Sequence, residues 1–160
     1  MKRGKAVEQD MAEAVKWMCT LNTFGEIVAK HQYIHALTDI TGFGLLGHVL
    51  EMAEGSNLSA KIYMEKVPLL NNIGAYLDQF IFPDMTTRNF NSYKDKMNDL
   101  SARQLLIGCD PQTSGGLLLA VDPLFEKEFI NLCKDHGMEH LVKESVGVLT
   151  EKKEKSVFVY

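Results

Sequence analysis

Apolar residues recur every three or four positions near the start of the chain, and charged residues lie between them. This spacing predicts an amphipathic helix from about residue 7 to residue 22, with a further helical turn to residue 30. The apolar stripe of this helix consists of Val7, Met11, Ala14, Val15, Met18 and Leu21.

Similar patterns predict short strands and helices along the rest of the chain. The strands are expected at residues 33–39, 59–64, 117–121, 141–149 and 156–160. The helices are expected at residues 43–53, where Gly55 ends the helix, at 68–80, at 101–107, and from Pro123 to just before Gly137.

The remaining segments show no helical period. Residues 81–100 are the least regular part of the chain, and we expect a functional loop there with a short strand near residues 90–93, on the basis of Pro83, Asp84, Asn89, Asn91 and Ser92. The segment DPQTSGG at residues 110–116 predicts a tight turn whose own amides bond the side chains of Asp110 and Ser114. The run LLLAV that follows it is apolar on both faces, which indicates an interior strand. Strands and helices mixed in this way predict an α/β (α+β) fold, with helices packed on a mixed β-sheet.

The length and composition are those of one globular domain. The 160 residues are 46% hydrophobic and 24% charged, and the formal net charge of −4 argues against a general nucleic-acid surface. Cys19, Cys109 and Cys133 form no C-x-x-C pair, which is typical of reduced thiols in a cytosolic protein. No apolar run approaches the ~20 residues that cross a bilayer, and no apolar core follows the basic start. We therefore expect a cytoplasmic protein that binds neither membrane nor nucleic acid.

The segment HALTDITGFGLLGH at residues 35–48 concentrates the polar chemistry of the chain. It places Asp39 where a strand ends, and TGFG at residues 41–44 opens the helix that follows. A helix start exposes unpaired N–H groups that suit anionic oxygens, and a carboxylate beside it can bind a hard cation. These features predict a magnesium–phosphate site. One carboxylate is too few for a complete site, so we expect further ligands from outside these residues.

Two alternative interpretations of this segment stay open. GFGLLG at residues 42–47 satisfies G-x-G-x-x-G, and Glu65 lies near the position of a ribose-binding acid, which would indicate a dinucleotide site. The preceding strand is short and polar, however, whereas a dinucleotide-binding strand is buried and apolar. Asp39 could also be only a capping or turn residue beside a plain helix start.

Other polar side chains give weaker indications. We expect His48 to be a satisfied helical histidine that faces a loop, and His35, His136 and His140 have no metal-site spacing. Arg88 could clamp a phosphate or carboxylate, but a solvated loop arginine is the simpler interpretation. No spacing indicates a Ser-His-Asp or Cys-His arrangement, so no catalytic residue is assigned in this chain.

Two motifs in order, TDITGFGLLGH at residues 38–48 and DPQTSGGLL at residues 110–118, resemble selenophosphate synthetase (selenide, water dikinase). The resemblance covers the C-terminal half of that enzyme and nearly all of this chain, including MCTLN at residues 18–22. It implies the ATP-binding superfamily that includes aminoimidazole ribonucleotide synthetase, whose C-terminal domain is a layered α/β unit. Residues 1–160 would then be a single C-terminal domain of a two-domain enzyme.

The resemblance also implies a reaction, which converts ATP, selenide and water to selenophosphate, AMP and phosphate. Asp39 would help to bind its Mg²⁺, and Thr41, Gly42 and Gly44 would line the ATP phosphate region by backbone amides. The implied partners are the protein's own N-terminal domain, ATP and selenide, in an enzyme that we expect to be a homodimer at full length.

Two departures from the family pattern limit what these residues are expected to do alone. The N-terminal half, with the catalytic Cys or selenocysteine and further metal-binding aspartates, is not part of the sequence, so we expect the isolated domain to be inactive. The family's Pro-Gly-Gly-Thr-x-Arg-Asn is here PDMTTRN at residues 83–89, without the two glycines that reach positive φ easily. This change keeps open a non-catalytic interaction or regulatory domain of a degenerate paralogue.

Overall fold

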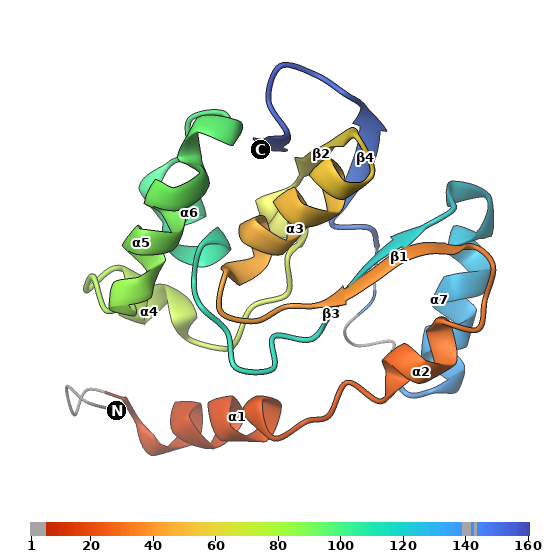
Figure 1. Cartoon of the computed structure of the whole chain (residues 1–160). Coiled ribbons are helices and arrows are strands. Elements are labelled where there is room, and N and C mark those ends of the chain that lie inside the picture. Colours follow the sequence, from red (N-terminus) through yellow and green to blue (C-terminus); the bar gives the residue numbers. More distant parts are fainter. Residues whose placement is uncertain (1–5, 139–141, 143) are drawn as a thin grey trace.

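Helices surround two small β-sheets in the computed structural model, which describes residues 6–138, 142 and 144–160 (Figure 1). The strands are β1 Ile34–Asp39, β2 Leu58–Ile62, β3 Leu117–Val121, β4 Gly147–Glu151 and β5 Val157–Val159. The α-helices are α1 Glu8–Met18, α2 Phe24–Val28, α3 Gly44–Gly55, α4 Ile73–Leu77, α5 Asp84–Tyr93, α6 Ala102–Gly108 and α7 Glu126–Asp135. Three 3₁₀ turns complete the described elements: η1 Met64–Lys66, η2 Lys94–Lys96 and η3 Pro123–Phe125.

One sheet is an antiparallel ribbon and the other is mixed. In the ribbon, β1 pairs with β3, so that Asp39 at the end of β1 lies opposite Leu117 at the start of β3. In the second sheet, the strand order is β4-β2-β5, with β2 antiparallel to β4 and parallel to β5. Strands of both senses with helices packed on them confirm the predicted α/β (α+β) class.

The prediction of an interior strand at residues 117–121 is wrong. Within the described residues β3 pairs with β1 alone. Its apolar side chains are divided between two hydrophobic clusters. Leu118 belongs to the cluster around α3, whereas Leu119 and Val121 pack with Val28 and Phe129. A run that is apolar on both faces therefore reflects two clusters on the two sides of a narrow ribbon, and not a strand with two neighbours.

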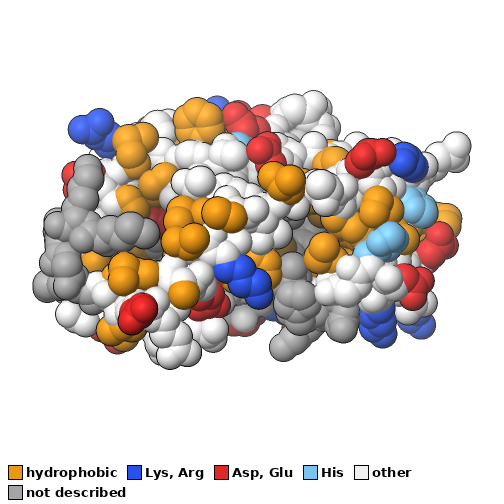
Figure 2. Space-filling model, turned by 90° about the horizontal axis from the view of Figure 1, so that it is seen from below, with side chains coloured by type: hydrophobic (Ala, Val, Ile, Leu, Met, Phe, Trp, Pro, Cys, Tyr) orange, Lys and Arg blue, Asp and Glu red, His pale blue; other side chains and the backbone are white. Residues whose placement is uncertain are grey.

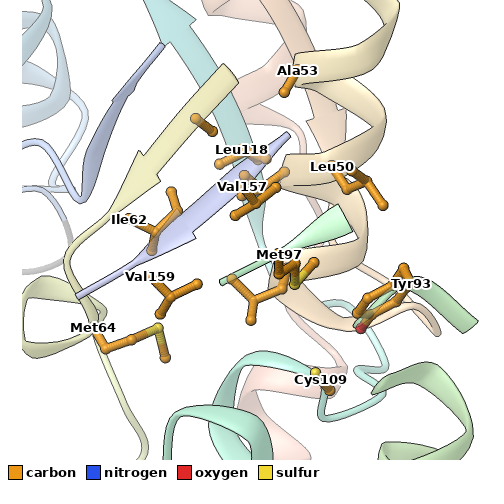
Figure 3. Close-up of a cluster of buried hydrophobic side chains, with 13 residues drawn as sticks. Leu50, Ala53, Ile62, Met64, Tyr93, Met97, Cys109, Leu118, Val157 and Val159 are labelled. Carbon is orange, nitrogen blue, oxygen red and sulfur yellow. The ribbon is translucent and has the colours of Figure 1, made fainter. Parts of the chain in front are cut away.

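The larger cluster surrounds α3. Side chains of α3 meet those of β2 and β5, and the other buried members of the cluster are Met64, Tyr93, Met97, Cys109 and Leu118 (Figure 3). The α3 residues Leu46, Val49, Leu50 and Ala53 of this cluster lie at helical spacing, which is why the sequence pattern predicted this helix correctly. Because α3 is held so firmly, the loop that enters it is anchored at one end.

Helix α5 replaces the irregular loop that the sequence predicted. Thr86, Asn89 and Tyr93 are buried at helical spacing, and Pro83 precedes the first turn. The buried face escaped prediction because two of its three residues are polar. The helix expected at residues 68–80 is also wrong in extent, because only α4 forms there. A left-handed residue, Asn72, precedes α4, and another, Phe80, follows it.

Several predicted ends can be checked against the structure. Ser101 caps α6 in a reciprocal pair with Gln104, and Gly137 with φ +70° follows α7 as expected. At the end of α3, however, Asn57 with φ +53° and not Gly55 supplies the left-handed residue. The strand expected at residues 141–149 is wrong in its start, because residues 142 and 144–146 are not strand and β4 begins only at Gly147, while residues 141 and 143 lie outside the described residues.

Helix α1 lies apart from both hydrophobic clusters, along the lower edge of the molecule in Figure 1. None of its residues is buried. Polar contacts tie it to the α4 region: Tyr76 donates its hydroxyl proton to Asp10, and Asn71 Nδ2 donates to Glu13 Oε1 at 2.9 Å. No helix among the described residues is both long and apolar enough to cross a membrane.

Candidate functional site

The two motifs that the sequence singled out lie against each other. The backbone N–H of Ile40 donates to the carbonyl of Gly116 at 2.9 Å, and the N–H of Gly115 donates to the carbonyl of Ile40 at 2.9 Å. The N–H of Gln112 donates to the carbonyl of Thr41 at 3.1 Å. The loop at residues 39–44 and the turn at residues 110–116 therefore form one structure at the start of α3.

Asp39 is the last residue of β1, and its side chain is exposed. The strand alternates, so that His35, Leu37 and Asp39 share the more exposed face. Across the described part of the chain, no group of three or more His, Cys, Asp or Glu residues is placed to hold a metal ion. A metal ion at Asp39 would therefore need ligands from substrate, water or another part of the protein.

Side chains of helix α5 donate hydrogen bonds to carbonyl oxygens of the loop at residues 39–44. Asn89 Nδ2 donates to the carbonyl of Gly42 at 2.8 Å and to that of Cys109 at 3.0 Å. The hydroxyl of Tyr93 donates to the carbonyl of Phe43 at 2.9 Å. These two side chains were missed by the sequence analysis because the segment was expected to be a loop. The one available signal was Asn89 itself, which ends the TTRN part of the family motif.

Some backbone N–H groups of the loop donate a hydrogen bond, and others are free. The N–H of Thr41 donates to His48 Nε2 at 3.0 Å, and the N–H of Gly44 donates to the carbonyl of Thr41 at 3.0 Å. Within the described residues, the N–H groups of Gly42 and Phe43 have no acceptor. Of the three residues that the sequence assigned to phosphate binding, only Gly42 has a free amide in this structure.

Gly44 has a structural reason to be glycine. Its φ is +72°, and a Cβ on this residue would lie 2.8 Å from the carbonyl carbon of Cys109 and 2.9 Å from the carbonyl oxygen of Asp110. Both neighbours are backbone atoms, which cannot swing away as a side chain could. The start of α3 can therefore approach the end of α6 this closely only without a side chain at residue 44.

Asp110 is the perturbed carboxyl group of this region. Burial raises its pKa to about 6, and hydrogen bonds from the side chains of Gln112 and Thr86 oppose that rise. Gln112 Nε2 lies 2.6 Å from one carboxyl oxygen and Thr86 Oγ1 lies 3.5 Å from the other. The prediction that Asp110 and Ser114 bond the amides of their own turn is wrong, because Ser114 donates to the carbonyl of Thr20 at 2.9 Å.

The histidines and Arg88 fall largely as the sequence indicated. His48 is buried in α3 and faces the loop as expected, but it is only partly satisfied, because Nδ1 has no hydrogen-bond partner among the described residues. His35 lies 3.6 Å from Asp122, and the His136 ring lies tilted against the Phe24 ring at a centroid distance of 5.5 Å. His140 lies outside the described residues. Arg88 is exposed as expected, but it lies in helix α5 and not in a loop.

The dinucleotide interpretation of G-x-G-x-x-G fails on topology. That motif works in a unit in which the strand before it and the strand after its helix lie parallel in one sheet. Here β1 and β2 belong to different sheets. The glycines serve packing instead, since a Cβ on Gly47 would lie 2.7 Å from Phe43 Cβ and 3.2 Å from the Tyr93 ring.

Comparisons with known proteins match nearly the whole chain. Residues 5–160 match the family described as AIR synthase related protein, C-terminal domain. The chain is 44% identical over 158 residues to a selenide, water dikinase of Pseudomonas putida and 41% identical over 158 residues to one of Haemophilus influenzae. These alignments cover 99% of this chain and 45% of each relative. A selenide, water dikinase of a Shewanella species is 49% identical over 148 residues, which are 92% of this chain and 41% of that protein. The chain thus spans less than half the length of the curated relatives that it matches.

Proposed function

The chain belongs to the AIR synthase related family of C-terminal domains, and from this membership we propose that it is the C-terminal domain of an ATP-dependent selenophosphate synthetase. The full-length enzyme would convert ATP, selenide and water to selenophosphate, AMP and phosphate in the cytoplasm. Residues 1–160 would form a single domain that completes a site on the N-terminal domain and is inactive alone.

The observation that carries this proposal is the contact between the loop at residues 39–44 and the turn at residues 110–116. The contact fixes the backbone on both sides of Thr41, while the Asp39 carboxylate and the Gly42 amide stay exposed. A carboxylate and free N–H groups at a helix start are complementary to a magnesium-bound phosphate. Both features belong to the segment that resembles the selenide, water dikinases.

The residues present fit Mg²⁺ in their donor chemistry. Mg²⁺ is usually held by one or two carboxylates together with water and substrate phosphates, and Asp39 offers one accessible carboxylate. When bound, the ion would neutralise phosphate charge. In this proposal Asp39 binds the metal, Gly42 donates its amide to a phosphate oxygen, and Thr41 and Gly44 shape the same region of the loop.

Two observations support a second domain. The matched relatives are more than twice as long as this chain. In addition, α1 and the residues beside it expose apolar side chains, namely Val7, Val15, Met18 and Leu21. The face of the molecule that carries α1 shows apolar groups at several places (Figure 2). Apolar surface of this kind commonly contacts another protein surface. We propose that the N-terminal domain covers it, in an enzyme that is a homodimer at full length.

The decisive experiment is Asp39→Asn in the protein joined to its N-terminal domain. We expect selenide-dependent AMP formation to fall by on the order of 100-fold or more, because the metal loses a charged ligand. Circular dichroism and urea unfolding should be unchanged, because the side chain is exposed. The matched control is Asp135→Asn, which removes an exposed carboxylate from α7 and should keep full activity. Full activity in Asp39→Asn, or loss of its fold, would show that Asp39 does not act as a metal ligand.

A further inference from the structure

His48 is buried one turn into α3 and is only 6% exposed. Its Nε2 atom accepts the backbone N–H of Thr41 at 3.0 Å and lies 3.2 Å from Thr41 Oγ1. Thr41 lies between Ile40, which the 110–116 turn binds, and Gly42, whose amide is free. A side chain from inside the helix therefore reaches back to the middle of the proposed binding loop.

This hydrogen bond determines where the ring carries its proton. A backbone N–H can only donate, so Nε2 must be unprotonated and the proton of the neutral ring is on Nδ1. Nδ1 lies 3.1 Å from Glu51 Oε2, one turn further along α3, although the direction is not that of a hydrogen bond. The Glu51 carboxylate thus favours the tautomer that Thr41 requires. The ring also meets Phe43 edge-on, with 6.0 Å between the ring centroids.

We propose that His48 is a positioning residue for the magnesium–phosphate site. By accepting the Thr41 N–H, it sets the direction of the backbone from Asp39 to Gly42, so that the carboxylate and the free amide face one ligand. The turn at residues 110–116 and helix α5 bind mainly carbonyl oxygens of this loop. His48 is the acceptor for its central amide. This inference rests on the proposed function and adds to it a residue that touches neither metal nor phosphate.

The alternative role for His48 is to fill the core and nothing more. The two roles differ in which atom matters. A core-filling role depends on the volume of the side chain, whereas positioning depends on an acceptor at the place of Nε2. A hollow of about 140 Å³ lies beside the ring, lined by Thr38, Leu37 and Glu51 among others. Side chains of a different shape can therefore be tested here without severe crowding.

Glutamine and asparagine separate these roles. The side-chain oxygen of glutamine can reach the place of His48 Nε2, whereas that of asparagine reaches only as far as Nδ1. We would compare His48→Gln with His48→Asn in the protein joined to its N-terminal domain. The control is Val49→Ala, which removes buried volume from the next residue of α3 and leaves the His48 acceptor of the Thr41 N–H in place.

Two measurements are made on each variant. Deuterium uptake of a peptide spanning residues 40–44 reports the protection of the Thr41 amide. The Mg²⁺ concentration for half-maximal ATP turnover, measured beside the kcat at saturating Mg²⁺, reports the geometry of the site. For His48→Asn we expect faster exchange and about a tenfold higher Mg²⁺ requirement, with a smaller change in kcat. His48→Gln should restore both values, and Val49→Ala should change neither.

The outcomes separate this inference from the function on which it rests. Equal Mg²⁺ requirements in the Gln and Asn variants, or the same change in Val49→Ala, would overturn the positioning role alone. A wild-type protein without magnesium-dependent, selenide-dependent ATP turnover would overturn the proposed function and the positioning role together. Faster exchange in His48→Asn with an unchanged Mg²⁺ requirement would show that His48 supports only the fold of the loop.

Discussion

A single carboxyl group, that of Asp110, is the clearest electrostatic feature of this domain. It lies beside the backbone that packs against Gly44, and burial raises its pKa to about 6 from the ordinary value of 3.8. Desolvation disfavours the ionised form more strongly than the hydrogen bonds from Gln112 and Thr86 favour it. The folded protein therefore holds this proton at a pH where the unfolded chain has released it.

The stability of the protein should depend on pH through this group. Between about pH 4 and about pH 6 the folded state binds more protons at Asp110 than the unfolded state, so the free energy of unfolding decreases as the pH rises. From about pH 4 to about pH 7, the free energy of unfolding measured in urea should therefore fall more in the wild type than in Asp110→Asn. We expect the difference between the two decreases to be on the order of 1 kcal/mol, after allowance for partial exposure.

The control for this prediction is Asp84→Asn, which removes an exposed carboxylate from the first turn of α5. The difference in the free energy of unfolding between Asp84→Asn and the wild type should be nearly the same at both pH values. A difference between the wild type and Asp110→Asn that does not vary with pH would contradict the raised pKa.

Among the elements, α5 is the one whose contribution to the candidate site is least evident from its sequence. Its buried face consists of Thr86, Asn89 and Tyr93, and each of them hydrogen-bonds a group outside the helix. The missing glycines of the family motif correspond to Asp84 and Met85, which lie in the first turn of α5. An α-helix needs no positive φ there, so this departure from the family pattern is compatible with the helix.

Asn89 should be the side chain on which the docking of α5 depends most. Replacing it by alanine removes the donor to the carbonyls of Gly42 and Cys109, and an unpaired buried carbonyl costs free energy. We expect Asn89→Ala to lower the free energy of unfolding by about 2–4 kcal/mol in urea titrations. The control Asn91→Ala changes an exposed residue of the same helix and should cost less than about 0.5 kcal/mol. Equal losses in the two variants would contradict this account.

For the whole molecule, the arrangement of the sheets places the candidate site at an edge. The β1–β3 ribbon has hydrophobic clusters on both sides, and β1 and β3 meet the loop and the turn at the same end of the ribbon. The site is therefore exposed and open toward any further domain. Its single exposed carboxylate cannot by itself satisfy a divalent ion.

This incompleteness predicts that the 160 residues alone do not catalyse. We expect no selenide-dependent AMP release from the isolated chain, and a dissociation constant for Mg-ATP on the order of 1 mM or weaker by calorimetry. The same chain joined to its N-terminal domain should release AMP. Turnover by the isolated chain would show that the site is complete without the second domain, and inactivity of the joined protein would favour an interaction or regulatory role.

The sequence alone determined the parts that depend on local order. The periodic apolar residues of α3 gave its position, the helix expected at residues 101–107 matches α6, and the sequence pointed to the segment at residues 35–48 as the candidate site and to residues 110–116 as a tight turn. These signals are local because spacing, capping and turn formation involve residues close in the chain.

Only the tertiary structure decided which polar residues are buried and what they bind. The face of α5 is polar in sequence, and its burial depends on carbonyl oxygens in other segments. Likewise, the bond from Thr41 to His48, the raised pKa of Asp110 and the contact behind Gly44 each require the folded chain. Sequence spacing carries no information on such partners, because folding and not chain distance brings their atoms together.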